Sequence, residues 1–551
     1  MRRWNGWGEE ATTYPLPESA ALYLSGLLGP GTAHPDVTFS QVLATVPPSR
    51  LPTHPMITTN PDVRALHARG QSLPDWVALR AGRIDAFPDG VAFPDSDDDI
   101  RSLLALASES GTRLIPYGGG TSVVGHINPL PAARPVLTVD LGRMTRLIDL
   151  DETSLLASFQ AGVRGPDLEA QLNARGYTLG HYPQSFELST LGGWIATRSS
   201  GQQSYHYGRI EDLFAGGCLE TPLGALELPP FPASAAGPDL RHLVLGCEGR
   251  LGMITRAIVR VRPLPEAEAF YGVFFRDWES GVAAVRAIAQ ARAPVSMLRL
   301  SDPQETDTTL RLSGGGRLVA LADSVLRRLG YGSERCLLII GFTGDRRTVA
   351  KVRRQATGLL RSHGGFFPLQ PIGAMWRKSR FLTPYLRNTL WELGYAVDTF
   401  ETAGPWSSVH PLAAAAAQAL RDSLEHLGEK VHAFAHLSHV YADGASVYCT
   451  AIFRRSAEPD ETLARWREMK AAVSQAFVAY GGTISHQHGV GIDHMPYLTA
   501  EKGVLGLAAL EAARAALDPD SIMNPGKLIP SDVPMRPSAQ VPHDQSPIPN
   551  L

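Results

Sequence analysis

The stretch Pro116-Tyr117-Gly118-Gly119-Gly120-Thr121-Ser122 decides how the rest of the chain is interpreted. It follows directly on Arg113–Pro116, which we expect to be a short strand. Three adjacent glycines permit positive φ and remove every Cβ from one side, so that successive N–H groups can face one concavity. Such a concavity can hold a pyrophosphate, although three glycines also occur in ordinary turns. The spacing is not GxGxxG, and it therefore does not indicate a Rossmann nucleotide site.

Three later stretches accompany this glycine loop. They read PQSFELSTLGGW at 183–194, TRSSG at 197–201 and GCEGRLGMIT at 246–255. In order and spacing, over residues 85–265, the four stretches resemble the FAD-binding domain shared by vanillyl-alcohol oxidase, glycolate oxidase subunits and D-lactate dehydrogenases. The resemblance implies an α+β fold, in which a PCMH-type FAD-binding domain of two α/β subdomains precedes an antiparallel-sheet cap domain with helices.

The same resemblance implies that the cofactor is FAD and that the glycine loop holds its pyrophosphate. Some members of this fold bind the flavin covalently through a histidine in that loop. Here the matching residue is Thr121, which cannot form the bond, so we expect non-covalent FAD; His126 is a weaker covalent candidate. The residues expected to line the cofactor are Pro116, Tyr117, Gly118, Gly119, Gly120, Thr121, Ser122, Pro183, Gln184, Ser185, Phe186, Glu187, Leu188, Ser189, Ala196, Thr197, Arg198, Ser199, Glu248, Gly249, Arg250, Leu251, Gly252, Met253 and Ile254.

Composition limits the classes of function. The chain has 551 residues, 44% of them hydrophobic and 19% charged, which favours a large folded core. A net charge of −3 gives no basic footprint for nucleic acid. The four cysteines lie far apart, which predicts buried, reduced thiols in a cytoplasmic protein. Without a long apolar run, membrane contact would be peripheral.

The sequence pattern divides the chain into five parts. We expect a wrapping segment rich in Pro, Gly and Trp at 1–84, the FAD-binding domain at 85–266 and the cap domain, with helices on one face of its sheet, at 267–480. Residues 481–530 would return to the flavin site, and 531–551 would be a flexible tail. The local expectations are a helix capped by Ser96 and Asp99 and stopped by Gly111, a helix opening at Pro166, and strands at Val136–Asp140, Leu155–Val163, Cys336–Phe342 and Ala445–Phe453.

The second half of the chain bears on the reaction. It contains HLSHVYADGASVY at 436–448 and SHQHGVG at 485–491. The D-2-hydroxy acid dehydrogenases of this fold carry metal-binding histidines and a glutamate in similar stretches. Where they have the second histidine and the glutamate, this chain has Tyr448 and Gln487. Because a phenol and an amide are poor ligands for a divalent cation, we expect no metal site.

Other stretches resemble the alkylglycerone-phosphate synthases, the FAD enzymes of ether-lipid synthesis. They include WNGWG at 4–8, YLR at 385–387, FETAGPW at 400–406 and the pair Tyr441 and Tyr448. The resemblance covers most of the chain. It implies exchange of the acyl group of acyl-dihydroxyacetone phosphate for a fatty alcohol through a redox-neutral flavin N5 adduct. Homodimers and contact with a membrane surface are further expectations.

The family reaction suggests a role for each candidate residue. Arg387 would hold the substrate phosphate, since a guanidinium matches phosphate oxygens in pairs. Tyr448 would move a proton if a neighbour lowers its pKa, with His486 and His488 as bases or supports. Arg299 would add a second positive charge. Without the family resemblance, a tyrosine on a strand is ordinarily a packing residue. Arg387 and Arg299 could likewise each form a structural ion pair.

Two features depart from the synthases and keep an alternative open. The synthases show three consecutive histidines where this chain has Gln487 in the middle. The stretch LDPDSIMNPGK at 517–527 looks more like the ending of the hydroxy acid dehydrogenases. The alternative function is an FAD-linked oxidoreductase acting on a 2-hydroxy acid or a glycerol phosphate. A third hypothesis, a flavin-binding paralogue without catalysis, is disfavoured because candidate acids, bases and phosphate binders are all present.

Overall fold

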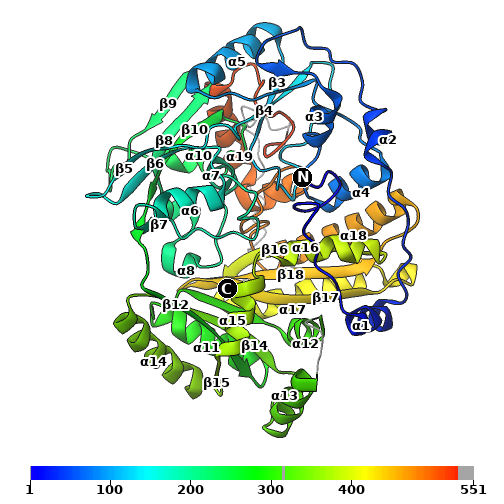
Figure 1. Ribbon diagram of the computed structural model, residues 1–551, viewed down its shortest axis with the longest axis vertical. Helices are drawn as coiled ribbons and strands as arrows, with labels where there is room; N and C mark the ends of the chain where they lie inside the picture. Colours follow the sequence, from blue (N-terminus) through cyan, green and yellow to red (C-terminus); the bar gives the residue numbers. More distant parts are fainter. Residues whose placement is uncertain (1, 313–316, 531–551) are drawn as a thin grey trace.

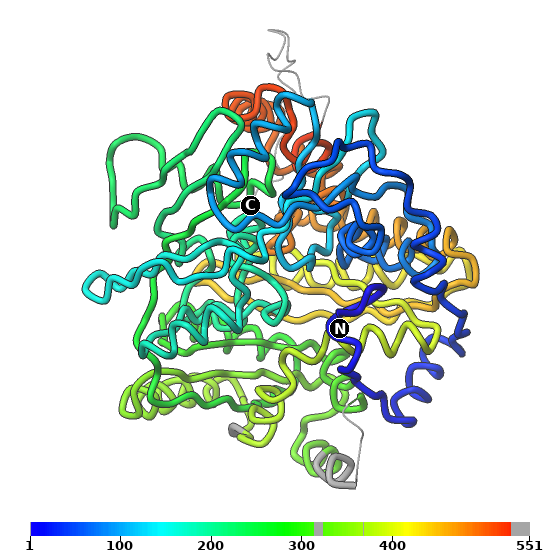
Figure 2. The backbone as a smooth tube through the Cα atoms, turned by 45° about the horizontal axis from the view of Figure 1, so that its top comes forward, coloured from blue at the N-terminus to red at the C-terminus, as the bar shows by residue number. Residues whose placement is uncertain are grey.

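The computed structural model describes residues 2–312 and 317–530. A cofactor half, upper in Figure 1, sits on a cap whose large sheet lies across the lower half. The N-terminal segment starts near the junction between the two halves, passes through α1 beside the cap and then follows one edge of the molecule to α2 and α3 in the cofactor half (Figures 1 and 2). The predicted flexible tail lies outside the described residues. Among those residues, no helix has the length and apolar character needed to cross a membrane.

The first sheet of the cofactor half carries the glycine loop. Its strands, in spatial order, are β1 (Ile57–Thr58), β2 (Gly90–Ala92), β4 (Val136–Asp140) and β3 (Arg113–Tyr117). The last three are parallel, so a helix must return the chain from β2 to β3. That helix is α5 (Asp97–Ser110), and the predicted capping pair is confirmed, because Ser96 and Asp99 form a reciprocal capping box. Gly111 ends the helix in the left-handed region, as expected.

The second sheet of the cofactor half is antiparallel. Its order is β5 (Leu147–Asp151), β6 (Leu156–Gln160), β10 (Met253–Arg260), β8 (Phe214–Thr221) and β9 (Gly224–Leu228). The helices α6 (Gly165–Asn173), which opens near Pro166 as predicted, and α7 (Leu191–Thr197) pack on it through a core that includes Phe159, Leu168 and Trp194. The remaining elements here are β7 (Tyr177–Thr178), α8 (Ser204–Tyr207), α9 (Ile210–Leu213), α10 (Arg241–Val244) and β11 (Arg262–Pro263).

The N-terminal segment wraps around the molecule and contributes to its cores. It contains α1 (Glu18–Leu28), α2 (Phe39–Leu43), α3 (Pro61–Leu66) and α4 (Leu73–Ala81). Leu24 and Leu28 of α1 pack against Tyr395 and Ile452 of the cap. In the strand-like start, Trp7 is buried and Trp4 packs on Phe39. The segment therefore ties the cap to the cofactor half.

The cap is a seven-stranded antiparallel sheet. In spatial order its strands are β15 (Phe366–Leu369), β12 (Ala267–Phe275), β14 (Cys336–Gly344), β13 (Met297–Ser301), β17 (Val431–Val440), β18 (Gly444–Arg454) and β16 (Tyr395–Pro405). Four helices cover one face: α11 (Trp278–Gln290), α14 (Arg346–Ser362), α17 (Trp406–Asp422) and α18 (Pro459–Ala479).

The other face of the cap sheet differs from the expectation of helices on one face only. Leu326 of α13 (Arg317–Arg328) and Ile372 of α15 (Gln370–Ser379) cover its β12–β14 end through an apolar cluster with Phe270 and Ile339. Successive residues of β12 and β14 are apolar, so both faces of these strands carry apolar side chains. Helices therefore cover these strands on both sides. Over β17, β18 and β16 this face carries Phe434, Ile452 and Val397 against α1, and next to them the polar side chains of His436, Tyr448 and Glu401. The helices α12 (Pro303–Leu312) and α16 (Thr383–Glu392) flank the sheet.

The C-terminal part crosses back to the cofactor half. After α18 the chain passes through the loop 481–494 into α19 (Leu498–Leu517), and the short 3₁₀ turns Glu425–Leu427 and Met495–Tyr497 complete the elements. Ile492 donates its amide to the carbonyl of Val124, and Asn524 to that of Leu114, so both ends of this segment are fastened beside the glycine loop.

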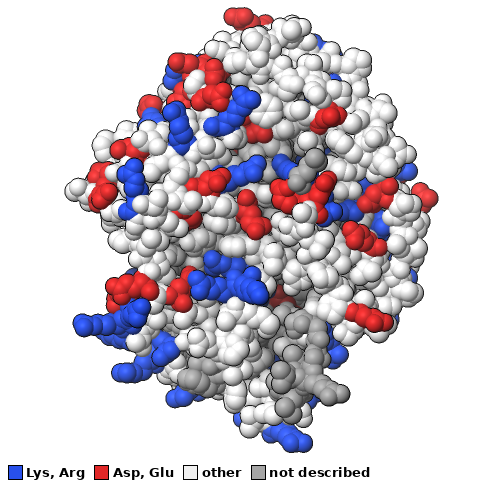
Figure 3. All heavy atoms as spheres, viewed as in Figure 1, with Lys and Arg blue, Asp and Glu red and all other residues white. Residues whose placement is uncertain are grey.

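The charged surface and the cysteines bear on two expectations drawn from composition: that the protein has no basic footprint for nucleic acid, and that its thiols are buried. On the face drawn in Figure 3, acidic and basic side chains intermingle, and the Lys and Arg side chains form no extended band. The expectation for the cysteines is confirmed, because all four are free and buried. Burial raises the pKa of each thiol, that of Cys247 to about 11.

Candidate active site

The centre of the site is a row of side chains across adjacent cap strands. Glu401 on β16 pairs with Tyr448 on β18, which pairs with His436 on β17. Side chains alternate between the faces of a strand, so these three project from the same face. Their neighbours Phe400 and Cys449 point the other way into the core under the four helices. The row therefore faces the cofactor half, whose helix α8 lies against β13 and β17.

Glu401 joins this row to the histidine loop. Its Oε1 accepts hydrogen bonds from the backbone amides of Gln487, at 2.7 Å, and His488, at 2.6 Å. Its buried Oε2 has no hydrogen-bond partner among the described residues and lies 3.9 Å from Nδ1 of His486. The Nδ1 of His488 is 3.5 Å from Oε1. Oε1 of Glu401 thus holds the histidine loop, and Oε2 is left free to accept a hydrogen bond or a proton.

Tyr448 lies between two histidine rings. The His436 ring stacks on it with centroids 5.0 Å apart, and the His488 ring meets it edge-on at 5.6 Å. Burial raises the pKa of Tyr448 above its ordinary value, and the negative charge of Glu401 raises it further. A hydrogen bond with Thr399 and the charge of Arg387 act in the opposite direction but do not outweigh these two effects, so the condition that a neighbour lowers this pKa is not met on balance. Tyr448 is therefore neutral at neutral pH, and its hydroxyl carries a hydrogen that it can donate to a bound group.

His486 contacts Tyr441, and not Tyr448 as expected. Its Nε2 lies 2.6 Å from the hydroxyl of Tyr441, and its ring stacks on that of His439 at 5.1 Å. Burial holds the pKa of His486 well below its ordinary value, so the ring is neutral. The prediction that it supports Tyr448 is corrected: His488 is the histidine beside Tyr448, and His486 fixes Tyr441.

Gln487 points away from the reacting row. Its backbone amide is bound by Glu401. Burial lowers the pKa of His439 to about 3, and a hydrogen bond that the His439 ring donates to the Gln487 side chain partly offsets that effect. The side chain of Gln487 thus contacts His439 rather than Tyr448, so an amide at this position leaves His488 in place next to the phenol.

Arg299 is also placed differently from the expectation. Its Nη2 forms an ion pair with Oε1 of Glu305 at 2.7 Å, and Glu305 lies 3.0 Å from Nδ1 of His436. Burial raises the pKa of Glu305, but Arg299 and His436 outweigh it and keep the carboxyl ionised. The positive charge of Arg299 is therefore balanced by Glu305, which also contacts His436. It orients that ring and does not provide a second free cation for a substrate.

Arg387 presents an unused donor. Its Nη1 donates to the carbonyl of Gln71 at 2.6 Å, its Nε donates to Val397 at 3.1 Å, and its guanidinium lies over the Trp76 ring at 4.3 Å. Its buried Nη2 has no hydrogen-bond partner in the part of the chain that the structure describes. A rigidly held guanidinium with a free N–H edge is suited to bind an anionic oxygen.

The glycine loop passes a physical test for a phosphate cradle. The amides from Gly118 to Ser122 donate no hydrogen bond within the described residues, although Gly119 and Gly120 are buried. Buried amides without an acceptor are costly unless a ligand satisfies them. A Cβ on Gly119 would lie 1.9 Å from the carbonyl oxygen of Leu188, and one on Gly118 would lie 2.3 Å from Oγ1 of Thr190. The predicted loop and the 183–189 stretch are thus packed together, and their residues fit the pyrophosphate of FAD.

Some other predicted cofactor residues hold the protein together through their side chains. Both carboxylate oxygens of Glu248 accept backbone amides, Oε1 from Val490 and Oε2 from Gly491. Arg250 donates to the carbonyl of Met523, and Arg198 pairs with Glu211. The 248–254 stretch still reaches the loop, because Gly249 lies against Pro116 and the Glu248 amide donates to Ala196. His126 is engaged by Ser122 at 2.6 Å.

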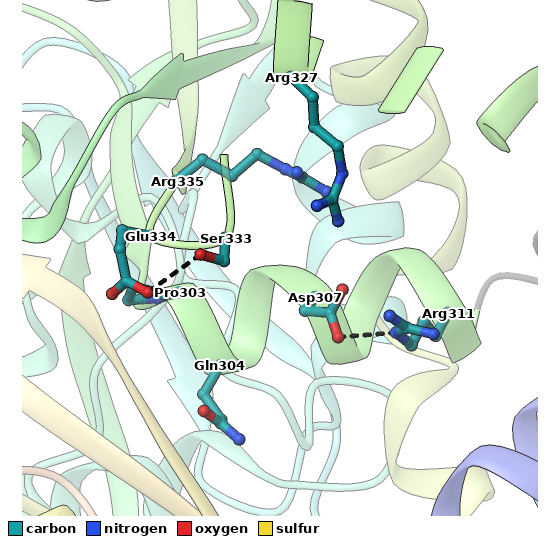
Figure 4. Close-up of a pocket in the computed structure, with 8 residues that line it drawn as sticks. All are labelled: Pro303, Gln304, Asp307, Arg311, Arg327, Ser333, Glu334 and Arg335. Atoms are coloured by element: carbon teal, nitrogen blue, oxygen red, sulfur yellow. Dashed lines mark hydrogen bonds and ion pairs between the residues drawn. The ribbon is translucent and has the colours of Figure 1, made fainter. Parts of the chain in front are cut away.

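A metal site and a second anion site are two other kinds of site that could bear on the reaction. No group of three or more His, Cys, Asp or Glu residues suited to a metal ion occurs within residues 2–312 and 317–530. Figure 4 shows a hollow beside α12, whose arginines are paired with Asp307 or Asp323. It therefore offers no uncompensated cation. Its lining residues are Pro303, Gln304, Asp307, Arg311, Arg327, Ser333, Glu334 and Arg335.

Comparison with known families supports the cofactor and the fold. Residues 88–226 match the family described as FAD binding domain, and residues 264–528 match FAD linked oxidases, C-terminal domain. These matches confirm the expected fold class and the expectation of FAD. The chain is thus a flavoprotein with a PCMH-type cofactor domain and an FAD-linked oxidase cap.

Individual relatives show to which family of these flavoproteins the chain belongs. The alkyldihydroxyacetonephosphate synthase of Dictyostelium discoideum is 33% identical over 534 residues, covering 95% of this chain and 86% of that protein. The enzyme of the same name from Trypanosoma brucei brucei is 31% identical and covers 85% and 77%. A solved alkyldihydroxyacetonephosphate synthase structure superposes with a TM-score of 0.82 at 28% identity, covering 96% of this chain and 99% of that one. The chain belongs to the alkyldihydroxyacetonephosphate synthase family.

The sequence alone did not single out Glu401, His436 or Glu305. Glu401 stands in the quoted FETAGPW stretch, where a lone acid within a strand-like run was the available signal. The alignment of His436 with Tyr448 depends on the β17–β18 register, which no local pattern specifies.

Replacing Gly119 with alanine tests the cradle. The added Cβ would displace the loop from Leu188, and we expect retention of FAD to fall at least about tenfold, the equivalent of 1–3 kcal/mol of overpacking. Flavin absorbance after gel filtration measures the loss. Alanine at Gly358, where a Cβ would meet no atom within 4 Å, is the control. Full flavin retention by Gly119→Ala would contradict the assignment.

Replacing Glu401 with glutamine tests the available carboxylate oxygen. The amide oxygen can still accept the loop amides, but the proton-accepting charge is lost. We expect kcat to fall by about 10²–10⁴ with FAD still bound. Glu429→Gln, which removes a carboxylate paired with Arg454, is the control and should leave kcat unchanged. A Glu401→Gln enzyme with at least half of the normal kcat would remove Glu401 from the reaction.

Proposed function

We propose that this protein is a flavin-dependent transferase that exchanges the acyl group of acyl-dihydroxyacetone phosphate for a fatty alcohol. Membership of the synthase family supports the reaction. The observation that carries the proposal is the free Nη2 edge of Arg387, whose Nε is fastened to the carbonyl of Val397 on β16, the strand that also carries Glu401. A phosphate-binding cation beside a row of proton carriers suits a phosphorylated substrate.

Substrate binding begins at the phosphate. The Arg387 guanidinium is already held by two backbone carbonyls and the Trp76 ring, so little side-chain freedom is lost on binding. Its remaining N–H edge would take a phosphate oxygen. This places the carbon chain of the substrate along the face that carries Tyr448 and Glu401.

The row of Glu401, Tyr448 and His436 contains the groups needed for the proton transfers of the exchange reaction. In the net reaction the bond between C1 and the ester oxygen breaks, and a bond forms between C1 and the alcohol oxygen. The alcohol proton ends with the released fatty acid. The free Oε2 of Glu401 would accept a proton from C1 or from the alcohol, and the protonated Tyr448 would donate one to the departing carboxylate. Bound FAD supplies an electron sink for the reacting carbon.

The histidines would support this row. His488 lies edge-on to Tyr448 and within 3.5 Å of Glu401, so it can pass protons between them. His436, held by Glu305, fixes the plane of the phenol. His486 and Gln487 act through the shape of their loop. The position of Gln487 away from Tyr448 supports the transferase over the oxidoreductase alternative, since the substitution does not remove the adjacent base.

The proposal includes non-covalent FAD, because Thr121 offers no histidine for a covalent bond. It also includes contact with a membrane surface, where long-chain alcohols would be supplied, and a homodimer. The site residues predicted from sequence, with Glu401 and His436 added, are part of the same proposal.

The exchange reaction can be tested directly. Purified protein is mixed without oxygen with acyl-dihydroxyacetone phosphate and a fatty alcohol, and the flavin spectrum is followed together with the products. We expect fatty acid and ether product in equal amounts, with no consumption of an electron acceptor. Lasting bleaching of the flavin by a 2-hydroxy acid, with electrons passed to a dye, would instead establish the oxidoreductase.

Tyr448→Phe tests proton donation. The phenyl ring keeps the packing between His436 and His488 but removes the hydroxyl. We expect kcat to fall by about 10²–10⁴ with FAD still bound. Tyr395→Phe, which removes a cap hydroxyl bonded to Gly29, is the control. If Tyr448→Phe retains full turnover, the proton-transfer assignment is wrong.

A further inference from the structure

Gln71 connects the cofactor loop with the proposed phosphate ligand through its own peptide groups. Its amide donates to the carbonyl of Ser122, at the end of the glycine loop, at 2.6 Å. Its carbonyl accepts Nη1 of Arg387, also at 2.6 Å. A single residue thus joins the two sites with short hydrogen bonds on each side, and its position sets the distance between them.

The side chain of Gln71 is fixed as firmly as its backbone. Its Oε1 accepts from Nε1 of Trp76 at 2.9 Å, and its Nε2 donates to the carbonyl of Gly6 at 3.3 Å. Trp76 is fully buried and also lies under the Arg387 guanidinium. Gln71 directly precedes Ser72, whose capping box with Asp75 begins α4. The residue is therefore held at the start of a rigid helix.

The segment Arg2–Gly8, here called the N-terminal strap, completes the connection. Trp7 and Asn388 exchange two hydrogen bonds, from the Trp7 amide at 3.1 Å and back to its carbonyl at 3.0 Å. A Cβ on Gly8 would lie 2.1 Å from the Tyr385 ring. Both partners belong to α16, the helix that carries Arg387. At the other end, Nη1 of Arg2 donates to the Tyr117 hydroxyl at 3.1 Å, below the glycine loop.

We propose that Gln71, held in place by the N-terminal strap, is a positioning residue that sets the distance between Arg387 and the cofactor loop. This inference rests on the proposed function, because it takes Arg387 as the phosphate ligand. A set distance selects substrates by the number of carbons between phosphate and reacting carbon. In acyl-dihydroxyacetone phosphate, the reacting C1 and the phosphate-bearing carbon are separated by one carbonyl carbon.

The experiment compares Gln71→Ala with Gln160→Ala. Gln160 is buried to the same 7% exposure and bonds Arg146 in the second sheet of the cofactor half. For Gln71→Ala we expect KM for acyl-dihydroxyacetone phosphate to rise about tenfold, within the range for two lost side-chain hydrogen bonds, with kcat and FAD retention unchanged. Gln160→Ala should leave KM unchanged. Gln71→Glu keeps the acceptor for Trp76 but loses the donor to Gly6, and should give an intermediate KM.

A double variant shows whether Gln71 acts through Arg387. Arg387→Lys should raise KM by itself, because an ammonium cannot reproduce the guanidinium contacts. Adding Gln71→Ala to Arg387→Lys should then raise KM no further, since the residue being positioned is already gone. Asn388→Ala, which releases the N-terminal strap, should raise KM in the same direction as Gln71→Ala.

Each contrary result identifies what has failed. If Arg387→Lys raises KM but Gln71→Ala and Gln71→Glu do not, the positioning role is wrong and the proposed function stands. If the two effects multiply in the double variant, Gln71 does not act through Arg387. If Gln71→Ala merely lowers FAD retention and kcat together, or if only the glutamate variant folds and its KM is normal, the role is structural. If Arg387→Lys leaves KM unchanged, the phosphate assignment and this inference both fail.

Discussion

The pleat and register of the cap sheet are the constraint on which the rest of the site depends. Glu401, Tyr448 and His436 stand in line because three antiparallel strands pair at those residues. A shift of one residue in β18 would turn Tyr448 into the core and bring Cys449 to the polar face. The helices α11, α14, α17 and α18 occupy the opposite face, and α13 and α15 cover only the β12–β14 end of this one, so the part that carries the row is left for the cofactor half. The junction between the two halves is thereby also the place of chemistry.

Burial then decides which groups carry charge at that junction. The pKa of His436, His439 and His486 is lowered by burial, and that of Tyr448 is raised, so all four favour the neutral form. Arg299 is balanced by Glu305. Arg387, by contrast, keeps an unused N–H edge, and Glu401 keeps an unused oxygen. The outcome is an anion-binding cation beside proton carriers, which matches a phosphorylated substrate better than a metal-assisted oxidation.

Much of the fold could be read from local patterns, and much of the site could not. The helix capped by Ser96, the strand Val136–Asp140 and the glycine loop follow from residue types at short spacing. Helices on the second face of the cap were missed because strands buried on both sides lack alternation. Glu401, His436 and Gln71 were missed for a related reason: their roles come from register and from contacts between segments more than 50 residues apart, such as that of Gln71 with Arg387. The raised pKa of Tyr448 could not be predicted either, because burial, which dominates it, is not visible in sequence.

The central claim is that this site breaks the bond between C1 and the ester oxygen, and forms an ether without net oxidation. The most direct measurement uses a fatty alcohol labelled with ¹⁸O at its hydroxyl in one reaction and a substrate labelled with ¹⁸O at the ester oxygen bonded to C1 in a second, with mass spectrometry of both products. The account predicts that the alcohol label is retained in the ether, and that the ester label leaves with the released fatty acid. Label appearing in an ester, or an unlabelled ketone or acid formed with reduced flavin, would contradict it.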